Sequence, residues 1–331
     1  MSIYQAFIER KKEKSKMAQR TDRGPFLIAA SYDITISVTD LANESAGFSA
    51  PLKFGLQNAQ ANRIIGLTGN RFAVASNPFI FVYDRTAKTN KPVQTFQGHQ
   101  TNVTDLCTDG NRMYSCSEDE SWRVWDFSQP RPLAVYQTSC CLNAISLMCN
   151  NTMVVTGNDR GQVELWNIND GKQVTQLRVS QSPIRSIAPS GNEGLAIVGC
   201  QDGTVVIVRI TETTITEERR VEAHTASTSR ASAHPAILTR VAASPDGKLF
   251  ATASADSTAK LWYVETGELK ATLADASQTR WIWDVAFTPD SSRICTGGTD
   301  KVCRVWDVET GELKKQVEWH QKGVTCIAII Q

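Results

Sequence analysis

The chain has 331 residues, a formal net charge of +1 and 41% hydrophobic residues, which is the composition of an ordinary globular protein. The balanced charge argues against both nucleic-acid binding and attraction to a membrane surface. None of the nine cysteines forms a CxxC pair, and reduced cysteines of this kind act as small hydrophobic core residues. We therefore expect no metal, no cofactor and a cytoplasmic protein without a membrane-inserted segment.

Residues 1–24 form a basic extension in front of the rest of the chain. They contain seven Lys or Arg and three acidic residues, a net charge of +4, while the remaining residues are slightly acidic. We expect a solvated, flexible and partly helical tail. An arm that binds nucleic acid or acidic lipids is the alternative, although no aromatic stacking platform accompanies the basic residues.

From residue 25 onward the chain repeats a Trp-Asp-like pair at spacings of 41 to 53 residues. The seven positions that start the pair are Thr39, Tyr83, Trp125, Trp166, Arg209, Trp262 and Trp306. A period of about 40–45 residues with this dipeptide is typical of WD40 repeats, each of which forms one four-stranded propeller blade. The sequence therefore predicts an all-β fold, a seven-bladed WD40 β-propeller over residues 25–331.

Each repeat consists of short apolar strands separated by tight turns, as residues 241–262 illustrate. A Ser-Pro-Asp-Gly turn at 244–247 joins the first two strands, and a turn that contains Asp256 precedes the third. Proline sets the first turn position and glycine accepts the left-handed one, so these residues specify hairpins.

The two ends of the chain predict how the ring closes. The first repeat begins with its second and third strands, at 26–30 and 35–38, and its missing first strand matches residues 324–329. We therefore expect the C-terminal strand to complete the N-terminal blade. The longest spacing falls at 211–235 and predicts an extended outer strand followed by a mobile loop.

Ser, His, Asp and Trp recur at corresponding positions of the better repeats, with the Asp six residues before the Trp. One such set could form a hydrolytic triad. Because the set recurs, whereas a catalytic triad would occur once, we predict a structural hydrogen-bonded network that includes the indole N–H. Its predicted members are His99, Ser117, Asp119, Trp125, His234, Ser254, Asp256, Trp262, Asp300 and Trp306. His224, in the long segment, is expected to be solvated.

Trp281 and Trp283 stand where the repeat has small or polar residues at the start of an innermost strand. Side chains alternate along a strand, so both tryptophans should point the same way. Large aromatic residues at such a rim are favoured interface anchors, although one of them could instead pack between blades. The matching positions of other repeats add polar residues, and the predicted partner-binding set is Gln60, Asn62, Asn102, Asn143, Arg185, Trp281 and Trp283.

The last third of the chain resembles a known family. The residues that carry the resemblance are Leu249–Asp256, Arg280–Trp283, Val308–Lys314 and His320–Val324. They are similar to the G-beta-like WD40 subunit of target-of-rapamycin (TOR) kinase complexes, the lethal-with-SEC-thirteen protein eight family.

The resemblance implies a non-catalytic subunit that is shared by both TOR complexes and supports TOR signalling in growth control and actin cytoskeleton organisation. It also implies that the chain binds the C-terminal lobe of the TOR kinase domain, next to other complex subunits, and meets membranes only through these partners. Trp281, Trp283, Gln60 and Asn62 match the kinase-facing positions of the family.

Two other functions remain as alternatives. The first is a WD40 scaffold of another pathway, such as a G-protein-beta-like adaptor or a ubiquitin-ligase substrate receptor. The second is a propeller enzyme, which would need ionisable groups that converge on the central channel. The positions that register places at the channel are amides, threonines and aromatic residues, so we expect no catalytic residues.

Overall fold

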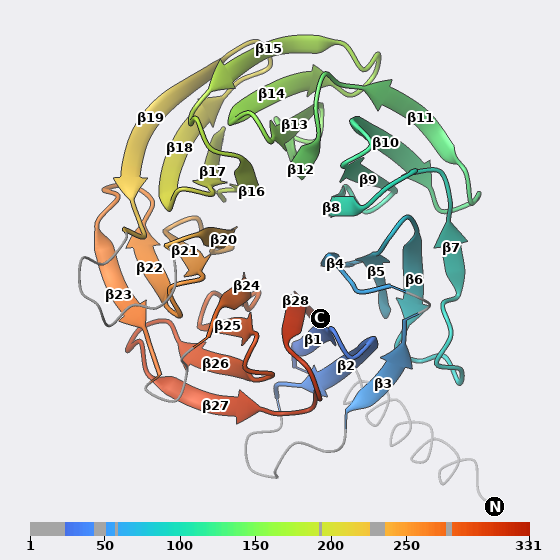
Figure 1. Ribbon diagram of the computed structural model, residues 1–331, viewed down its shortest axis with the longest axis vertical. Helices are drawn as coiled ribbons and strands as arrows, with labels where there is room; N and C mark the ends of the chain where they lie inside the picture. The colour runs from blue at the N-terminus through green and yellow to red at the C-terminus, as the bar shows by residue number, and fades with distance from the viewer. Residues whose placement is uncertain (1–23, 43–50, 57–58, 192–193, 226–235, 276–279) are drawn as a thin grey trace, which may run out of the picture.

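The structure is a computed structural model that describes residues 24–42, 51–56, 59–191, 194–225, 236–275 and 280–331. The described residues form seven four-stranded antiparallel sheets that are arranged as a ring (Figure 1). The prediction of an all-β, seven-bladed propeller is confirmed. The basic stretch 1–24 lies, except for Gly24, outside the described residues. No helix that could span a bilayer occurs in the described part of the chain.

In every blade the first strand lies nearest to the axis and the fourth forms the outer edge (Figure 1). Blade one contains β28 Val324–Ile330, β1 Phe26–Ser31, β2 Thr35–Asp40 and β3 Leu52–Gly55. Blades two to four contain β4 Arg63–Gly66, β5 Arg71–Ala75, β6 Ile80–Asp84, β7 Gln94–Phe96, β8 Val103–Thr108, β9 Arg112–Ser117, β10 Ser121–Asp126, β11 Pro132–Gln137, β12 Leu142–Met148, β13 Met153–Asn158, β14 Gln162–Asn167 and β15 Gln173–Arg178. Blades five to seven contain β16 Ile184–Pro189, β17 Leu195–Cys200, β18 Thr204–Ile210, β19 Ile215–Glu222, β20 Leu238–Ala243, β21 Leu249–Ser254, β22 Ala259–Tyr263, β23 Leu269–Leu273, β24 Ile282–Phe287, β25 Arg293–Gly298, β26 Cys303–Asp307 and β27 Leu313–Val317.

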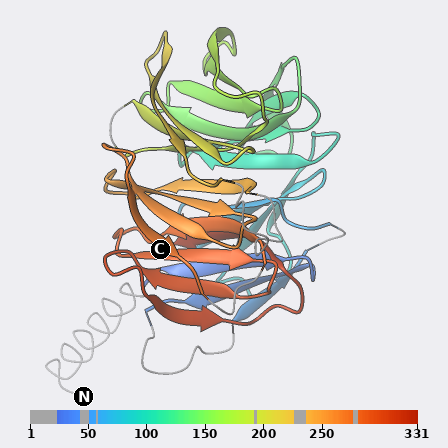
Figure 2. The same cartoon turned by 60° about the vertical axis from the view of Figure 1, so that its left-hand side comes forward.

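The C-terminal strand closes the ring, as the sequence predicts. β28 pairs antiparallel with β1, so that Ile327 lies opposite Ala29 and Ile330 opposite Phe26. Figures 1 and 2 both place the blue N-terminal strands beside the red C-terminal strand. Blade one is therefore built from both ends of the chain. Separation of the two ends would break the hydrogen bonds between β28 and β1.

Neighbouring blades share their hydrophobic cores. The ring of Phe54 in blade one lies 5.6 Å from Phe72 and 5.5 Å from Tyr83 in blade two. Phe96 of blade two lies 5.5 Å from Trp125 of blade three. The apolar faces of a single blade would be exposed without both neighbours, which makes closure of the ring a requirement for stability.

The longest spacing between repeats contains the longest outer strand. β19 has eight residues and pairs along the full length of β18, which agrees with the extended outer strand that the sequence predicts. It carries exposed acidic and basic residues, of which Glu218 pairs with Arg209 of β18 at 2.6 Å, and charged outer edges resist pairing with other strands. The mobile loop predicted after this strand falls largely on residues 226–235, which lie outside the described residues.

Candidate partner-binding site at one mouth of the channel

Four blades carry a tryptophan at the anchor position, and the four indoles make the same hydrogen bond. Each Nε1 donates to a hydroxyl of the second strand at 2.8–3.1 Å, from Trp125 to Ser115, Trp166 to Thr156, Trp262 to Thr252 and Trp306 to Thr296.

The strand register selects the hydroxyl that accepts the indole. Trp125 is paired with Met113, and the acceptor Ser115 lies two residues beyond it on β9. Ser117 and Ser254, which the sequence places in this network, therefore do not accept the indole N–H themselves. The Oγ atoms of these serines instead accept the backbone N–H of the turn aspartates, Asp119 and Asp256.

The network is complete in blade three. His99 bonds Asp119 Oδ2 through Nδ1 at 2.9 Å and Ser115 Oγ through Nε2 at 2.7 Å. Burial lowers the pKa of His99, although the Asp119 carboxylate opposes this shift. Burial alone would raise the pKa of Asp119, but hydrogen bonds from His99 and Ser121 and the charge of His99 lower it. A neutral histidine therefore connects an anionic turn aspartate to the Trp125 indole.

Blade six has the same arrangement with a different histidine from the predicted one. His224 Nδ1 lies 2.8 Å from Asp256 Oδ2, and its Nε2 lies 2.8 Å from Thr252 Oγ1. The expectation that His224 is solvated is wrong, because only 1% of this residue is exposed. The predicted histidine, His234, lies outside the described residues. His224 follows β19 closely, and its backbone N–H donates to Gly203 O at 3.0 Å, so the network residue comes directly after the outer strand.

In two further blades a charged residue of the third strand makes the contacts near the anchor tryptophan. In blade seven, the predicted Asp300 forms an ion pair with Arg304 at 2.7 Å, and Arg304 reaches Asp275 at 2.9 Å. In blade four, the buried Glu164 accepts a hydrogen bond from Thr156 at 3.0 Å. Burial raises the pKa of Glu164 against the effect of this bond. Both third-strand residues stand two positions before the anchor tryptophan, as Arg123 does in blade three, where it forms an ion pair with Asp119 at 3.1 Å.

These side-chain sets are closed to substrates. Ser115 and Thr252 are both 0% exposed, and each hydroxyl already contacts a histidine and an indole. A serine nucleophile needs access to the bond that it attacks. The geometry is that of a framework between strands. Among the described residues, no group of three or more His, Cys, Asp or Glu side chains could hold a metal ion.

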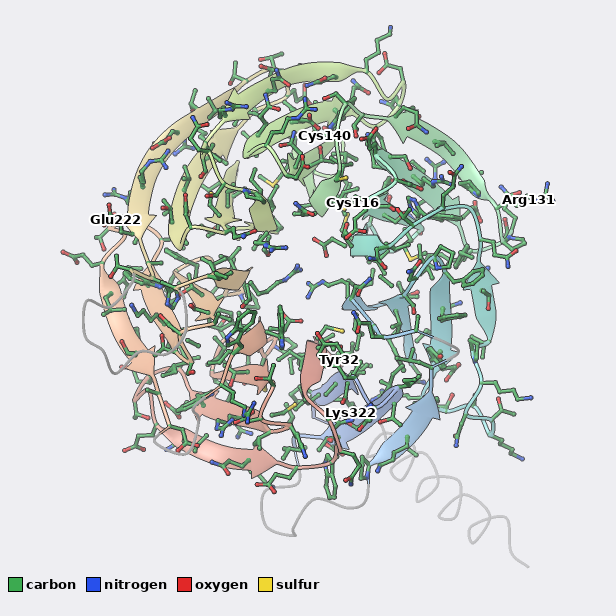
Figure 3. The ribbon with its side chains drawn as sticks, in the orientation of Figure 1. Tyr32, Cys116, Arg131, Cys140, Glu222 and Lys322 are labelled. Carbon is green, nitrogen blue, oxygen red and sulfur yellow. The ribbon has the colours of Figure 1, made fainter. Side chains whose placement is uncertain are left out.

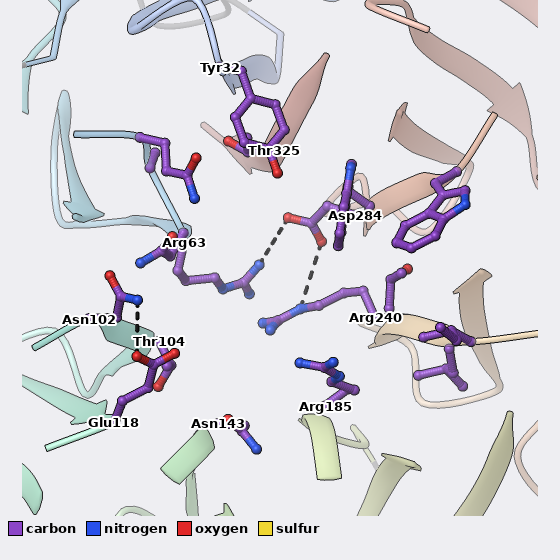
Figure 4. A pocket seen from close by; sticks show the side chains of 18 residues that line it. Tyr32, Arg63, Asn102, Thr104, Glu118, Asn143, Arg185, Arg240, Asp284 and Thr325 are labelled. Atoms are coloured by element: carbon purple, nitrogen blue, oxygen red, sulfur yellow. Dashed lines mark hydrogen bonds and ion pairs between the residues drawn. The ribbon is translucent and has the colours of Figure 1, made fainter. Parts of the chain in front are cut away.

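The residues predicted to contact a partner come together at one mouth of the channel (Figure 4). They line a single cavity of about 410 Å³, which we call the polar funnel, and they are Gln60, Asn62, Asn102, Asn143, Arg185, Trp281 and Trp283. The rings of Trp281 and Trp283 lie 5.3 Å apart at 57°, and Ile282 between them is fully buried. Their orientation agrees with strand alternation, while their contact with a partner stays a prediction.

Some funnel residues also hold the blades together. Asn62 Nδ2 donates to Val103 O of the next blade at 3.0 Å. Thr104 Oγ1 likewise donates to Leu142 O of the following blade at 2.8 Å. Thr239 Oγ1 donates to Ile282 O of the following blade at 2.7 Å. These bonds leave Asn62 with a structural role that the sequence does not reveal, whereas Trp283 makes no such bond among the described residues because its indole Nε1 has no partner there.

Four charged side chains cross the channel at the floor of the polar funnel. Arg63 Nε lies 3.1 Å from Asp105, and Arg63 Nη1 lies 3.4 Å from Asp284. Arg240 contacts the same two carboxylates, Asp105 at 3.4 Å and Asp284 at 3.7 Å. The expectation that only amides, threonines and aromatic residues face the channel is therefore wrong. On the opposite side of this charged layer lies a second cavity of about 400 Å³, largely lined by apolar strand residues.

A β-bulge explains why the sequence register did not place three of these four charges, Asp105, Arg240 and Asp284. In blades three to seven the register shifts within the first strand, for example between Ile282 and Asp284. A bulge sets two residues opposite one and redirects their side chains. As a result Trp283 and the following Asp284 both line the funnel. An Arg or Asp directly after the register position in four repeats is the sequence signal that could have revealed the layer.

The charged layer has no carboxylate that is free to act as a general base. Asp105 accepts backbone N–H groups of Leu106 at 3.0 Å and Ile145 at 3.3 Å in addition to both arginines. Asp284 accepts those of Val285 at 2.8 Å and Ile327 at 2.9 Å. Each aspartate thus reaches into the next blade, and the layer ties the ring together across its axis.

Comparison with known proteins agrees with this architecture. The family described as "WD domain, G-beta repeat" matches residues 90–126, 171–208, 226–263 and 267–307. The protein named "Protein LST8 homolog" of Dictyostelium discoideum is 30% identical over 244 residues, which cover 72% of this chain and 76% of that protein. The chain belongs to the LST8 family.

A second relative and a solved structure extend this result. The "Target of rapamycin complex subunit wat1" of Schizosaccharomyces pombe is 28% identical over 245 residues. The matched region covers 72% of this chain and 74% of that protein. The crystal structure of the computationally designed Ika8 protein superposes with a TM-score of 0.67, covers 91% of this chain and 86% of its own, and is 22% identical. This last likeness concerns the fold alone.

Proposed function

We propose that this LST8-family chain is a non-catalytic subunit of a TOR kinase complex. In this proposal it acts in the cytoplasm, binds the C-terminal lobe of the kinase domain through the mouth of the polar funnel, and meets membranes only through its partners. Membership of the LST8 family and the name of the Schizosaccharomyces pombe relative support the complex. The convergence of the seven predicted residues on one cavity, with two adjacent tryptophans, is the observation that carries the binding site.

The composition of the mouth suits protein recognition. Interfaces gain most of their binding energy from a few large residues, often Trp, which are surrounded by polar groups that exclude water. Trp281 and Trp283 are the large aromatic residues of this mouth, and Gln60, Asn102 and Asn143 line the same cavity with amides. The carboxylate of Asp284 is held by two arginines and two backbone N–H groups, and Glu118 accepts a hydrogen bond from Asn102, an arrangement that favours binding over catalysis.

Rigidity gives such a subunit a way to act on a kinase. A closed ring whose blades share cores and are tied across the axis changes shape little on binding. If it contacts one arrangement of the kinase lobe better than another, it stabilises that arrangement by the difference in contact free energy. The chain would then support TOR signalling without catalysing a reaction.

Affinity purification of the full chain from cells of its own organism tests the proposal. Mass spectrometry should recover a very large protein kinase of the TOR type with the wild-type chain. The double substitution Trp281→Arg with Trp283→Arg should lose this kinase while the thermal unfolding midpoint stays unchanged. Recovery of a G-protein or ubiquitin-ligase assembly in place of the kinase would contradict the proposal and favour a scaffold of another pathway.

A further inference from the structure

Three arginines converge on the polar funnel from three blades. Arg63 on β4, Arg185 on β16 and Arg240 on β20 all point toward its centre (Figure 4). Arg63 and Arg240 are bridged by the two aspartates of the charged layer. Arg185 is exposed to the funnel, and no described side chain or backbone group pairs with it. The funnel therefore contains one guanidinium that the propeller itself does not neutralise.

The described lining has more hydrogen-bond donors than acceptors. A guanidinium carries five N–H donors. The ion pairs of Arg63 use its Nε and Nη1 atoms, and those of Arg240 use its Nε and Nη2 atoms. The buried Nε1 of Trp283 has no partner among the described residues. Neither acidic residue of the lining is paired with Arg185: Asp284 is held by four other groups, and Glu118 accepts a hydrogen bond from Asn102 at 3.0 Å.

We propose that the polar funnel is a carboxylate-binding site that receives an Asp or Glu side chain of the protein docked on this face, and that Arg185 is its main contact. The inference rests on the proposed function, because a docked protein has to bring the acid. The funnel volume of about 410 Å³ accommodates an inserted side chain. The planar guanidinium binds a carboxylate through two parallel hydrogen bonds.

The cost of burying an unpaired charge explains why the occupant must be acidic. A protein that covers Trp281 and Trp283 also covers the funnel that these residues line, and it removes water from Arg185. A charge that loses its water without gaining a partner weakens binding strongly. A partner with an acidic side chain at this point avoids that loss and gains a charge-assisted hydrogen bond. A partner without one would be rejected, so Arg185 sets specificity as well as affinity.

Charge substitutions at Arg185 test this inference with the purified full chain and the kinase recovered with it. Arg185→Gln should weaken the dissociation constant about tenfold, and Arg185→Glu about a hundredfold, because repulsion then adds to the lost hydrogen bonds. Arg131, on the outer edge of blade three (Figure 3), is exposed as well, and Arg131→Glu is the matched control that should bind like wild type. All three variants should keep the wild-type unfolding midpoint, since neither arginine pairs with another described residue.

The outcomes separate this inference from the proposed function. Wild-type affinity in Arg185→Glu, together with loss of the kinase in the Trp281→Arg and Trp283→Arg variant, would overturn the carboxylate site and leave the proposed function standing. Wild-type affinity in all of these variants would overturn both. Native mass spectrometry of the isolated chain gives a further check: a bound phosphate-containing small molecule that disappears in Arg185→Gln would overturn the inference, because a free anion would then fill the site.

Discussion

The anchor tryptophans and the Trp281–Trp283 pair place the same side chain in opposite surroundings. Trp125 and Trp306 are 1% and 2% exposed, and their indoles donate to buried hydroxyls. Trp281 and Trp283 are half-buried, line an open cavity and have no counterpart in the other blades. The comparison teaches that residues which repeat around the ring build the blades, whereas residues which occur once at its mouth are available for recognition.

Loss of ring closure should have the largest effect. Deletion of residues 319–331 removes β28, which contributes buried Val324 and Ile327 to the core and pairs with all of β1. We expect no cooperative thermal unfolding and no soluble monomer in size-exclusion chromatography. Removal of the exposed Gln331 alone is the control and should leave both properties intact. A truncation at 318 that melts cooperatively would show that blade one does not depend on the C-terminal strand.

Truncation of one tryptophan of each kind should separate the two groups. Trp125→Ala leaves a cavity between blades two and three and removes the indole that donates a hydrogen bond to Ser115 beside His99. The free energy of unfolding should therefore fall by about 4 kcal/mol. Trp283→Ala, at the open mouth, should change it by less than about 1 kcal/mol. Denaturant titrations of both variants measure the difference. Equal losses would mean that the Trp281–Trp283 pair belongs to the framework.

The turn aspartates should make the framework sensitive to acid. Burial alone would raise the pKa of Asp256, but hydrogen bonds from His224 and Thr258 and the charge of His224 lower it from 3.8 to about 2. This carboxylate therefore stabilises the fold by about 2 kcal/mol above pH ~4, and the contribution is lost as the pH falls toward ~2. Asp256→Asn should lose this amount at neutral pH and match wild type near pH ~2.

Denaturation at a series of pH values measures this contribution. The control is Glu309→Gln, which alters a carboxylate whose side chain is 90% exposed, and it should follow the wild-type curve throughout. A difference between wild type and Asp256→Asn that persists unchanged at pH ~2 would contradict the assigned pKa. Burial lowers the pKa values of His99 and His320 below the ordinary value of 6.5. The unfolded chain therefore binds protons more readily at these residues, and the free energy of unfolding should begin to fall as the pH drops below about 6.5.

Blade four should respond to pH in the opposite sense. Burial raises the pKa of Glu164, so its contribution is complete below the ordinary value of 4.5 and is lost as the pH rises through the raised pKa. Glu164→Gln removes the ionisation but keeps the shape of the side chain. We expect its unfolding midpoint to exceed that of wild type by roughly 2 °C at pH ~8 and to equal it below pH ~4. A lower midpoint at pH ~8 would mean that the ionised carboxylate is the stabilising form.

Most of the fold could be predicted from the sequence because its determinants repeat. Three local features predict it: the anchor spacing, the turn residues and the displaced first strand. Each specifies the structure of one blade, and similar blades packed side by side form the ring. The errors lie where packing in three dimensions decides between equivalent residues. Ser115 and Ser117 are both hydroxyl residues of one strand, and only the diagonal reach of Trp125 across the pair of strands selects Ser115.

The candidate site could be predicted in part. Strand alternation brought Trp281, Trp283 and the polar register positions to one cavity. It did not place Arg63, Asp105, Arg240 and Asp284, each of which directly follows a register position. Bulges in the first strands of blades three, six and seven redirect Asp105, Arg240 and Asp284, and strand alternation alone does not predict a bulge. His224 could not be predicted from spacing, because it lies 32 residues before Asp256, whereas His99 lies only 20 residues before Asp119 in blade three. His234, 22 residues before Asp256, fits the repeat better.

Affinity and stability measured on the same double variant test the central claim most directly. Trp281→Ala with Trp283→Ala should weaken binding of the purified TOR-type kinase at least a hundredfold, as expected for two interface anchors, while the free energy of unfolding changes by less than about 1 kcal/mol. Leu133→Ala with Val135→Ala, which truncates two exposed apolar residues of β11, should bind like wild type. Undiminished kinase binding in a folded Trp281→Ala and Trp283→Ala variant would contradict the assignment of the polar funnel as the kinase-binding site.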